Sequence, residues 1–169
     1  MLAGLPAHAT QYATADEAAK RSFPQATSFR DTTIQLTPQD MRAIAAGAGV
    51  PARSAQWHVL VAMNADKPIG VVVLDGVIGK FELIDYAVAI DPDGKVRNVE
   101  ILSYRESHGY EIRLPAWRKQ FVGKDKTAPL RVGDDIANIS GATMSCEHVT
   151  DGVRRIVAVV SVLRAAGKL

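Results

Sequence analysis

The sequence predicts an α+β domain, in which an antiparallel sheet of hairpins is preceded by short N-terminal helices and followed by a long C-terminal helix packed on it. Three observations predict this fold class. Helix-capping sequences occur near the N-terminus, paired apolar runs separated by turn sequences fill the middle of the chain, and an apolar stripe of helical period occupies the C-terminus. The 169 residues are 47% hydrophobic and 22% charged, an ordinary composition for one globular domain.

Two short helices are predicted before the sheet-forming region. Thr14 is a good N-cap for a helix over residues 15–21, which carries acidic residues in its first turn and is stopped by Pro24. Residues 27–36 then have the character of a strand. Thr37 followed by Pro38 begins a second helix, because proline is favoured at the first helical position, and glycines at 47 and 49 end it.

Two hairpins are predicted in the middle of the chain. Residues 56–63 and 69–74 are apolar runs joined by the turn-forming residues 64–67, and residues 81–90 and 96–102 flank the sequence Asp91-Pro92-Asp93-Gly94. In this second turn, proline presets the first central residue and glycine accepts a positive φ. Consecutive hairpins of this kind predict an antiparallel sheet.

The C-terminal helix has the strongest pattern. Val149, Val153, Ile156, Val160 and Leu163 follow one another at spacings of four, three, four and three, which places them on one face of a helix running from residue 143 to residue 166. The helix should therefore pack its apolar face on the sheet.

The N-terminal sequence predicts export. Residues 2–9 resemble the end of a secretory signal peptide, with Ala7 and Ala9 forming an A-x-A cleavage site before Thr10. We therefore expect residues 1–9 to be a signal-peptide remnant, residues 10–169 to be a single domain, and the location to be periplasmic or otherwise extracytoplasmic. A short unstructured terminus is the alternative. We expect no transmembrane segment, because no stretch reaches the roughly 18 apolar residues that a spanning helix needs.

Charge and cysteine content exclude several classes of function. The 20 lysines and arginines nearly balance the 18 acidic residues and are scattered, so nucleic acid is not expected as a partner. The single cysteine, Cys146, has no partner for a disulfide and no catalytic arrangement around it, so we expect it to pack in the core. His108 and His148 lack the spacing of a metal site, and we expect neither a metal nor catalytic residues.

The segment before the long helix has the composition of an anion site. Ser140-Gly141-Ala142-Thr143, followed by Ser145, places small residues and hydroxyls at a helix start. The first turn of a helix has unpaired backbone N–H groups and partial positive charge, which together favour a phosphate. The spacing alone also suits a simple helix cap, and that alternative stays open at this point.

The same segment resembles the signature of the FMN-binding domain family, which includes domains of the sodium-translocating NADH:quinone reductase, the Rnf complex and NosR-type proteins. The resemblance extends over roughly residues 68–160. It includes Gly79-Lys80, the turn at 91–94, the loop that begins at Tyr104 and the Gln120 to Lys124 segment. It implies FMN as the cofactor, with its phosphate held by Ser140, Gly141, Ala142, Thr143 and Ser145.

The resemblance also implies covalent attachment by a flavin transferase. In the family, the threonine that corresponds to Thr143 can be esterified by the FMN phosphate. The transferase reads an acidic residue six positions earlier, where this chain has Ala137, while Asp134 and Asp135 lie too early. We expect the ester at Thr143, with non-covalent FMN at the same helix start as the alternative.

A second wall of the flavin site is implied by the resemblance. The loop that lies against the flavin ring would consist of Glu106, Ser107, His108, Gly109, Tyr110 and Glu111. Gly109 permits close approach of the backbone to a flat ring. Lys80, Arg105, Arg113 and Lys124 are candidates for tuning the flavin, whereas Trp117 is expected to anchor a short helix together with Phe121.

The main hypothesis is an FMN-binding electron carrier that exchanges electrons with a redox partner protein, either soluble or membrane-bound. Two alternatives remain: a flavin-free ligand-binding or scaffold module of the same fold, and a small flavin-dependent reductase with its own substrate.

Overall fold

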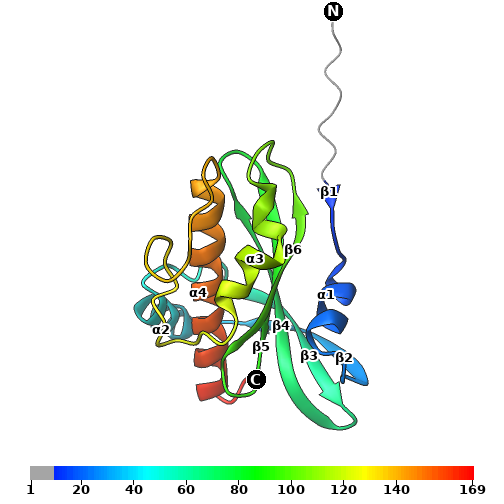
Figure 1. The fold of residues 1–169 in the computed structure, drawn as a ribbon. Coiled ribbons are helices and arrows are strands. Elements are labelled where there is room, and N and C mark those ends of the chain that lie inside the picture. The colour runs from blue at the N-terminus through cyan, green and yellow to red at the C-terminus, as the bar shows by residue number, and fades with distance from the viewer. Residues whose placement is uncertain (1–9) are drawn as a thin grey trace, which may run out of the picture.

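A single antiparallel sheet organises the protein, for which a computed structural model describes residues 10–169. The predicted signal-peptide remnant, residues 1–9, lies outside the described residues. Six strands follow one another across the sheet in the order β1-β6-β5-β4-β3-β2 (Figure 1). They are β1 (Thr10–Gln11), β2 (Ser28–Gln35), β3 (Gln56–Asn64), β4 (Lys67–Ile78), β5 (Leu83–Ile90) and β6 (Val96–Tyr104).

The sheet is an up-and-down meander from β2 to β6, because each of these strands pairs with the next along the chain. This confirms the predicted α+β fold class. Strand β1 was not expected from the sequence, and it pairs antiparallel with the outer edge of β6. With only two residues, β1 is too short to show the alternating pattern by which strands are recognised.

The helices begin and end close to where the sequence predicts. They are α1 (Ala15–Ser22), α2 (Pro38–Ala48), α3 (Pro115–Arg118) and α4 (Thr143–Ala165), with short 3-10 turns at Tyr110–Arg113 and Lys119–Phe121. The expected caps of the first two helices are confirmed. Thr14 and Thr37 each accept a hydrogen bond from the backbone three residues later, and the side chains at those positions bond back to the caps.

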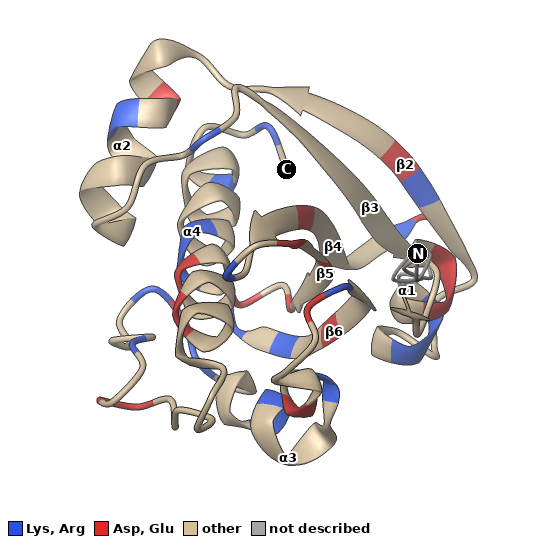
Figure 2. Ribbon diagram, turned by 90° about the horizontal axis from the view of Figure 1, so that it is seen from above, with Lys and Arg blue, Asp and Glu red and all other residues tan. Residues whose placement is uncertain are grey.

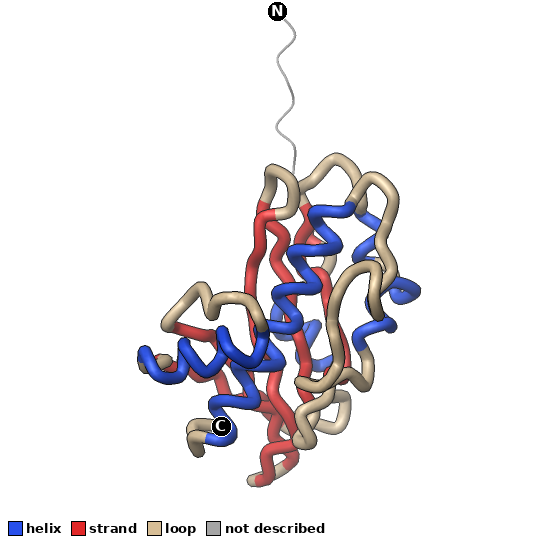
Figure 3. The backbone as a smooth tube through the Cα atoms, turned by 90° about the vertical axis from the view of Figure 1, so that its left-hand side faces the viewer, coloured by secondary structure: helices blue, strands red, loops and turns tan. Residues whose placement is uncertain are grey.

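The helices cover the two faces of the sheet unequally (Figures 2 and 3). The long helix α4 and helix α2 lie over one face, where they share a large apolar core, and α1 covers part of the other face. Strand β5 shows the alternation directly: Tyr86 and Val88 belong to the core under α4, whereas Ala87 and Ala89 belong to the smaller core under α1.

Helix α4 buries one apolar face against the sheet and leaves other positions exposed. All five residues of its predicted stripe, from Val149 to Leu163, are buried. Cys146 is also buried, as expected, and this burial raises the pKa of its thiol. Within residues 10–169, no helix is both long and apolar enough to cross a membrane. Charged residues of both signs are distributed around the fold (Figure 2).

Helix α4 approaches the sheet closely at Gly152. A Cβ atom at this position would lie 1.9 Å from the hydroxyl oxygen of Tyr86. Tyr86 is fully buried in β5 and donates a 2.6 Å hydrogen bond to Asp75 in β4. The absence of a side chain at 152 therefore sets how near the helix comes to the strands.

Replacement of Gly152 by alanine is expected to lower the free energy of unfolding by about 2 kcal/mol, because the new methyl group meets the buried Tyr86 ring. Gly47→Ala in α2 is the matched control. Nothing lies within 4 Å of a Cβ there, so that change should stabilise the protein by about 0.5 kcal/mol through helix propensity. Urea denaturation measures both. Equal effects of the two substitutions would contradict the close contact at Gly152.

Candidate flavin site

A cleft of about 540 Å³ opens at the end of the sheet where α4 begins. Three segments meet there: the turn between β4 and β5, the loop that follows β6, and the start of α4. The lining residues are Lys80, Phe81, Glu106, Ser107, His108, Gly141, Ala142, Thr143, Met144 and Ser145. The sequence places these segments far apart, and the meander brings them to one edge.

The start of α4 lacks the caps found in the other helices. Its N-cap residue is Ala142, which has no side chain to accept a hydrogen bond, and the first backbone bond into the helix runs from Cys146 N–H to the Ala142 carbonyl. Across residues 10–169, no acceptor is found for the backbone N–H groups of Thr143, Met144 and Ser145. These three donors belong to the first turn of α4, which lines the cleft. Unpaired N–H groups at a helix N-terminus favour the binding of an anion.

Thr143 has an exposed side chain at this helix start. Its hydroxyl oxygen accepts a 3.0 Å hydrogen bond from the side-chain amide of Asn138. This contact orients the hydroxyl group while leaving its own proton available to another acceptor. Asn138 was not expected in the site, since an asparagine in a loop gives no signal of which hydroxyl it will contact.

Two glycines allow the walls of the cleft to come together. Gly109 has φ +84°, and a Cβ atom there would lie 2.3 Å from the Cβ of Ala142. The loop after β6 therefore packs directly on the segment that precedes α4. At Gly79, a Cβ atom would lie 2.7 Å from a carboxylate oxygen of Glu106 and 3.0 Å from the hydroxyl oxygen of Ser145. A side chain at either position would separate the segments.

Glu106 holds the turn between β4 and β5 in place. One of its carboxylate oxygens accepts hydrogen bonds from the backbone N–H groups of Phe81 at 2.6 Å and Glu82 at 3.0 Å. Partial burial raises the pKa of Glu106, but the backbone hydrogen bonds from Glu82, Phe81 and Lys80 oppose burial and leave the pKa below its ordinary value. Glu106 is therefore an ionised structural anchor of the cleft.

Behind the cleft, Tyr104 connects the loop after β6 to the first turn of α4. Its hydroxyl group donates to the backbone carbonyl of His108 and lies 3.2 Å from the hydroxyl oxygen of Ser145. Burial is the main reason that the pKa of Tyr104 is raised, although the bond to Ser145 works in the opposite direction. Tyr104 thus stays protonated at neutral pH and ties the loop after β6 to the first turn of α4.

The structure brings seven of the eleven expected site residues to the cleft lining. These are Glu106, Ser107, His108, Gly141, Ala142, Thr143 and Ser145. The other four lie nearby but outside the lining: Ser140 is exposed in the preceding turn, Gly109 is buried behind the cleft, Tyr110 is 52% exposed beside the Arg113 guanidinium, and Glu111 is half-buried. Phe81 and Met144 were not expected in the site.

The candidate tuning residues are separated by the structure. Lys80 lines the cleft, with its ammonium group over the Phe81 ring. Arg105 instead pairs with Asp85, and Lys124 bonds the carbonyl oxygens of Gln120 and Asp135. Only Lys80 of the four expected cations is among the residues that line the cleft.

Trp117 is a core anchor, as expected. It is 5% exposed, and its ring meets Phe121 edge-on with the centroids 5.1 Å apart. Its indole N–H donates a 2.8 Å hydrogen bond to the carbonyl oxygen of Ala137, whose own N–H donates to the side chain of Gln120. The segment leading to Thr143 is thus held through its backbone, and the side chain of residue 137 is exposed.

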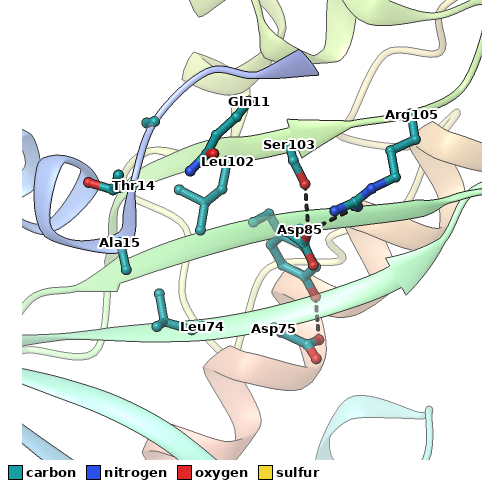
Figure 4. A pocket seen from close by; sticks show the side chains of 11 residues that line it. Gln11, Thr14, Ala15, Leu74, Asp75, Asp85, Leu102, Ser103 and Arg105 are labelled. Carbon is teal, nitrogen blue, oxygen red and sulfur yellow. Dashed lines mark hydrogen bonds and ion pairs between the residues drawn. The ribbon is translucent and has the colours of Figure 1, made fainter. Parts of the chain in front are cut away.

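A larger hollow of about 570 Å³ lies away from this cleft, between the N-terminal segment and strands β4 to β6 (Figure 4). Most of its polar side chains are already paired with one another. Asp85 accepts hydrogen bonds from Ser103 and Arg105, and Tyr86 donates to Asp75. Such internal pairing leaves little unsatisfied hydrogen-bonding capacity for a phosphate, so the cleft at α4 is the stronger candidate for the flavin site.

Comparisons with known proteins match the part of the chain that forms this cleft. Residues 79–158, which include the three segments that form the cleft, match the model of the FMN-binding domain family. A component of the proton-translocating ferredoxin:NAD(+) oxidoreductase complex of Clostridium ljungdahlii is 32% identical over 112 residues, 62% of this chain and 60% of that protein. The crystal structure of Shewanella oneidensis NqrC has a similar fold, with a TM-score of 0.54, 18% identity and 90% coverage of both chains.

Residues 79–158 therefore form an FMN-binding domain of this family, and FMN is the cofactor. The chain spans about 60% of the length of its relative from C. ljungdahlii. The uncapped start of α4 and the small residues around it fit the phosphate of FMN. The flavin-free alternative is not supported.

The lowered pKa of Glu106 predicts a pH-dependent effect of Glu106→Gln. An ionised Glu106 stabilises the folded state, so this contribution is fully present above the ordinary carboxyl pKa of 4.5 and is lost as pH falls through the lowered pKa of the folded protein. The variant should be less stable than wild type at pH 7, and the gap should close below pH 4.5. Thermal unfolding of wild type and variant at several pH values measures this difference in stability. A gap independent of pH would contradict the anchoring role.

Proposed function

We propose that the protein is an FMN-dependent electron carrier whose flavin phosphate binds at the start of α4. The observation that carries this proposal is the uncapped first turn, where three backbone N–H groups without acceptors in residues 10–169 adjoin the exposed hydroxyl group of Thr143. Thr143, Ser145, Gly141 and Ala142 would hold the phosphate, with Ser140 in the preceding turn. Residues 10–169 would act as one FMN-binding unit.

The flavin ring would lie along the cleft, against the loop after β6. Ser107 and His108 would contact it directly, while Glu106 and Gly109 would fix the loop behind it. Tyr110 and Glu111 would contribute from the loop's continuation, outside the lining of the cleft. Bound FMN supplies the ability to accept and release electrons one or two at a time. Lys80 would favour the reduced flavin, because a cation stabilises the negative charge that the flavin carries in that state.

Covalent attachment at Thr143 is part of this proposal. The Thr143 oxygen would attack the FMN phosphorus of an activated donor, a flavin dinucleotide held by a flavin transferase. The phosphorus–oxygen bond within the donor's pyrophosphate would break, the nucleoside monophosphate would leave and the hydroxyl proton of Thr143 would be released, so the protein would gain the mass of one FMN less one water. The contact from Asn138 supports the role of Thr143, since it orients the oxygen that would attack phosphorus.

The similarity to a component of a ferredoxin:NAD(+) oxidoreductase complex favours a carrier over a reductase with its own substrate. We infer a redox partner protein within a membrane complex, and an extracytoplasmic location. The exposed side chains of Phe81 and Met144, 73% and 42% accessible, would lie beside the flavin at the rim of the cleft. Rapid steady-state turnover of the isolated flavoprotein with a soluble donor and a small-molecule acceptor would favour the reductase instead.

Production with a flavin transferase in an exporting host should increase the intact mass by one FMN less one water. Thr143→Ala should abolish this increase, whereas Thr143→Ser, the matched control, keeps a hydroxyl group at the same atom position and should retain part of it. Intact-mass spectrometry with a visible spectrum measures both. Yellow Thr143→Ala protein of unmodified mass would still support the phosphate site, whereas wild-type protein that remains colourless with excess FMN would contradict it.

The companion variant is Ala137→Asp, which restores the acidic residue that the transferase reads in this family. The side chain at 137 is exposed and the local hydrogen bonds use its backbone, so aspartate should be tolerated. We expect a higher fraction of covalently modified protein than in wild type under identical production. An unchanged fraction would show that Ala137 does not limit attachment.

A further inference from the structure

A second hollow, of about 270 Å³, lies at the end of β4 and shares no lining residue with the flavin cleft. It is lined by Arg53, Val77, Ile78, His148, Asp151 and Arg155. We call it the arginine hollow. Its lining comes from the loop before β3, the end of β4 and the second to fourth turns of α4. The function proposed above makes no use of it.

Arg155 is the central observation. Only 6% of its side chain is exposed, and its Nε–H donates a 2.7 Å hydrogen bond to the Pro51 carbonyl. Its Nη1 atom is buried without a hydrogen-bond acceptor in residues 10–169. The Asp75 carboxylate is 3.9 Å away, beyond hydrogen-bond range, and it already accepts the 2.6 Å bond from Tyr86.

A buried guanidinium group with an unused donor is costly. Desolvation lowers the pKa of Arg155, although the negative charge of Asp75 partly opposes this effect. Natural structures retain such a group when a ligand or an ordered water completes its hydrogen bonds. Neither terminal nitrogen of Arg155 has a hydrogen-bond acceptor within residues 10–169, so the guanidinium group at the wall of the hollow keeps unused donor capacity.

Arg53 brings a second cation to the same hollow. Its backbone has φ +63°, a left-handed conformation that is unfavourable for a residue with a side chain. Its guanidinium group makes one long contact, 3.4 Å, to the Gly76 carbonyl, and its charge lowers the pKa of Arg155 further. The hollow therefore brings two cationic side chains near one another.

The remaining polar groups do not neutralise the two arginines. Asp151 lines the hollow but forms a 2.8 Å ion pair with Arg154. The Nδ1 atom of His148 bonds the carbonyl oxygens of Ile78 at 2.6 Å and Gly79 at 3.1 Å. Its other ring nitrogen, Nε2, has no hydrogen-bond partner within residues 10–169.

We propose that the arginine hollow binds a phosphate group through the guanidinium groups of Arg53 and Arg155. Paired guanidinium forks match the oxygens of a tetrahedral oxyanion, and the hollow has room for one phosphate with water or a small substituent. The ligand is either free phosphate or the headgroup of an anionic phospholipid. His148 links the hollow to the flavin cleft, because the backbone that it bonds continues into the turn at Lys80.

The test uses the FMN-loaded protein, so that the start of α4 is already occupied. Inorganic phosphate is titrated by calorimetry at constant ionic strength against chloride, and the imidazole C–H resonances of His148 are followed by NMR. We expect saturable binding with a shift of the His148 signal. Arg53→Gly should weaken binding roughly tenfold without destabilising the fold, since glycine accepts φ +63° and Arg53 is exposed.

Arg42→Ala is the matched control, because Arg42 is an exposed arginine on α2 outside the hollow, and this variant should bind as wild type does. Sedimentation with phosphatidylglycerol vesicles, compared with phosphatidylcholine vesicles, separates the two sources. Phosphate binding without vesicle binding identifies free phosphate, whereas Arg53-dependent binding of both identifies a headgroup. Absence of saturable phosphate binding, or binding unaffected by Arg53→Gly, would overturn the proposal.

Discussion

The close packing of helix α4 on the sheet is the constraint on which the rest of the structure depends. Gly152 permits this approach, since any side chain there would overlap the buried ring of Tyr86. The apolar stripe of the helix then fixes its rotation, with residues from Cys146 to Leu163 in the core. Once the position and rotation of α4 are set, its first turn must lie at the edge of the sheet where β4 and β6 end.

In this placement, the proposed phosphate site lies at a helix start rather than within a preformed pocket of charged residues. A cap at residue 142 would satisfy the first-turn N–H groups internally, as Thr14 and Thr37 do for α1 and α2. Alanine leaves them unpaired within the described chain. The neighbouring loops are then fixed by backbone hydrogen bonds to Glu106 and by contacts across Gly79 and Gly109, so the cleft is held rigidly around those donors.

Much of the fold could be predicted from the sequence, because its signals are local. Capping pairs mark α1 and α2, the turn at 91–94 marks a hairpin, and the stripe from Val149 to Leu163 marks α4. Strand β1 could not be predicted, since two residues carry no period and its pairing with β6 is a long-range contact.

The candidate site could be predicted only in part. Hydroxyls and small residues before a helix suggest a phosphate, and the family resemblance added the loop after β6. The contributions of Phe81, Asn138 and Tyr104 arise from the meander, which brings residues 80, 104 and 143 to one edge. The separation of Arg105 and Lys124 from the cleft likewise follows from ion pairs and hydrogen bonds that no local pattern indicates.

A titration of the flavin-free protein with FMN, followed by amide NMR, would locate the phosphate. If it binds at the start of α4, the backbone N–H signals of Thr143, Met144 and Ser145 should show the largest shifts and gain protection from solvent exchange. Unchanged signals at these three residues would contradict a phosphate site at α4, above all if signals elsewhere, such as those of Gln11 and Ser103 at the hollow of Figure 4, moved instead.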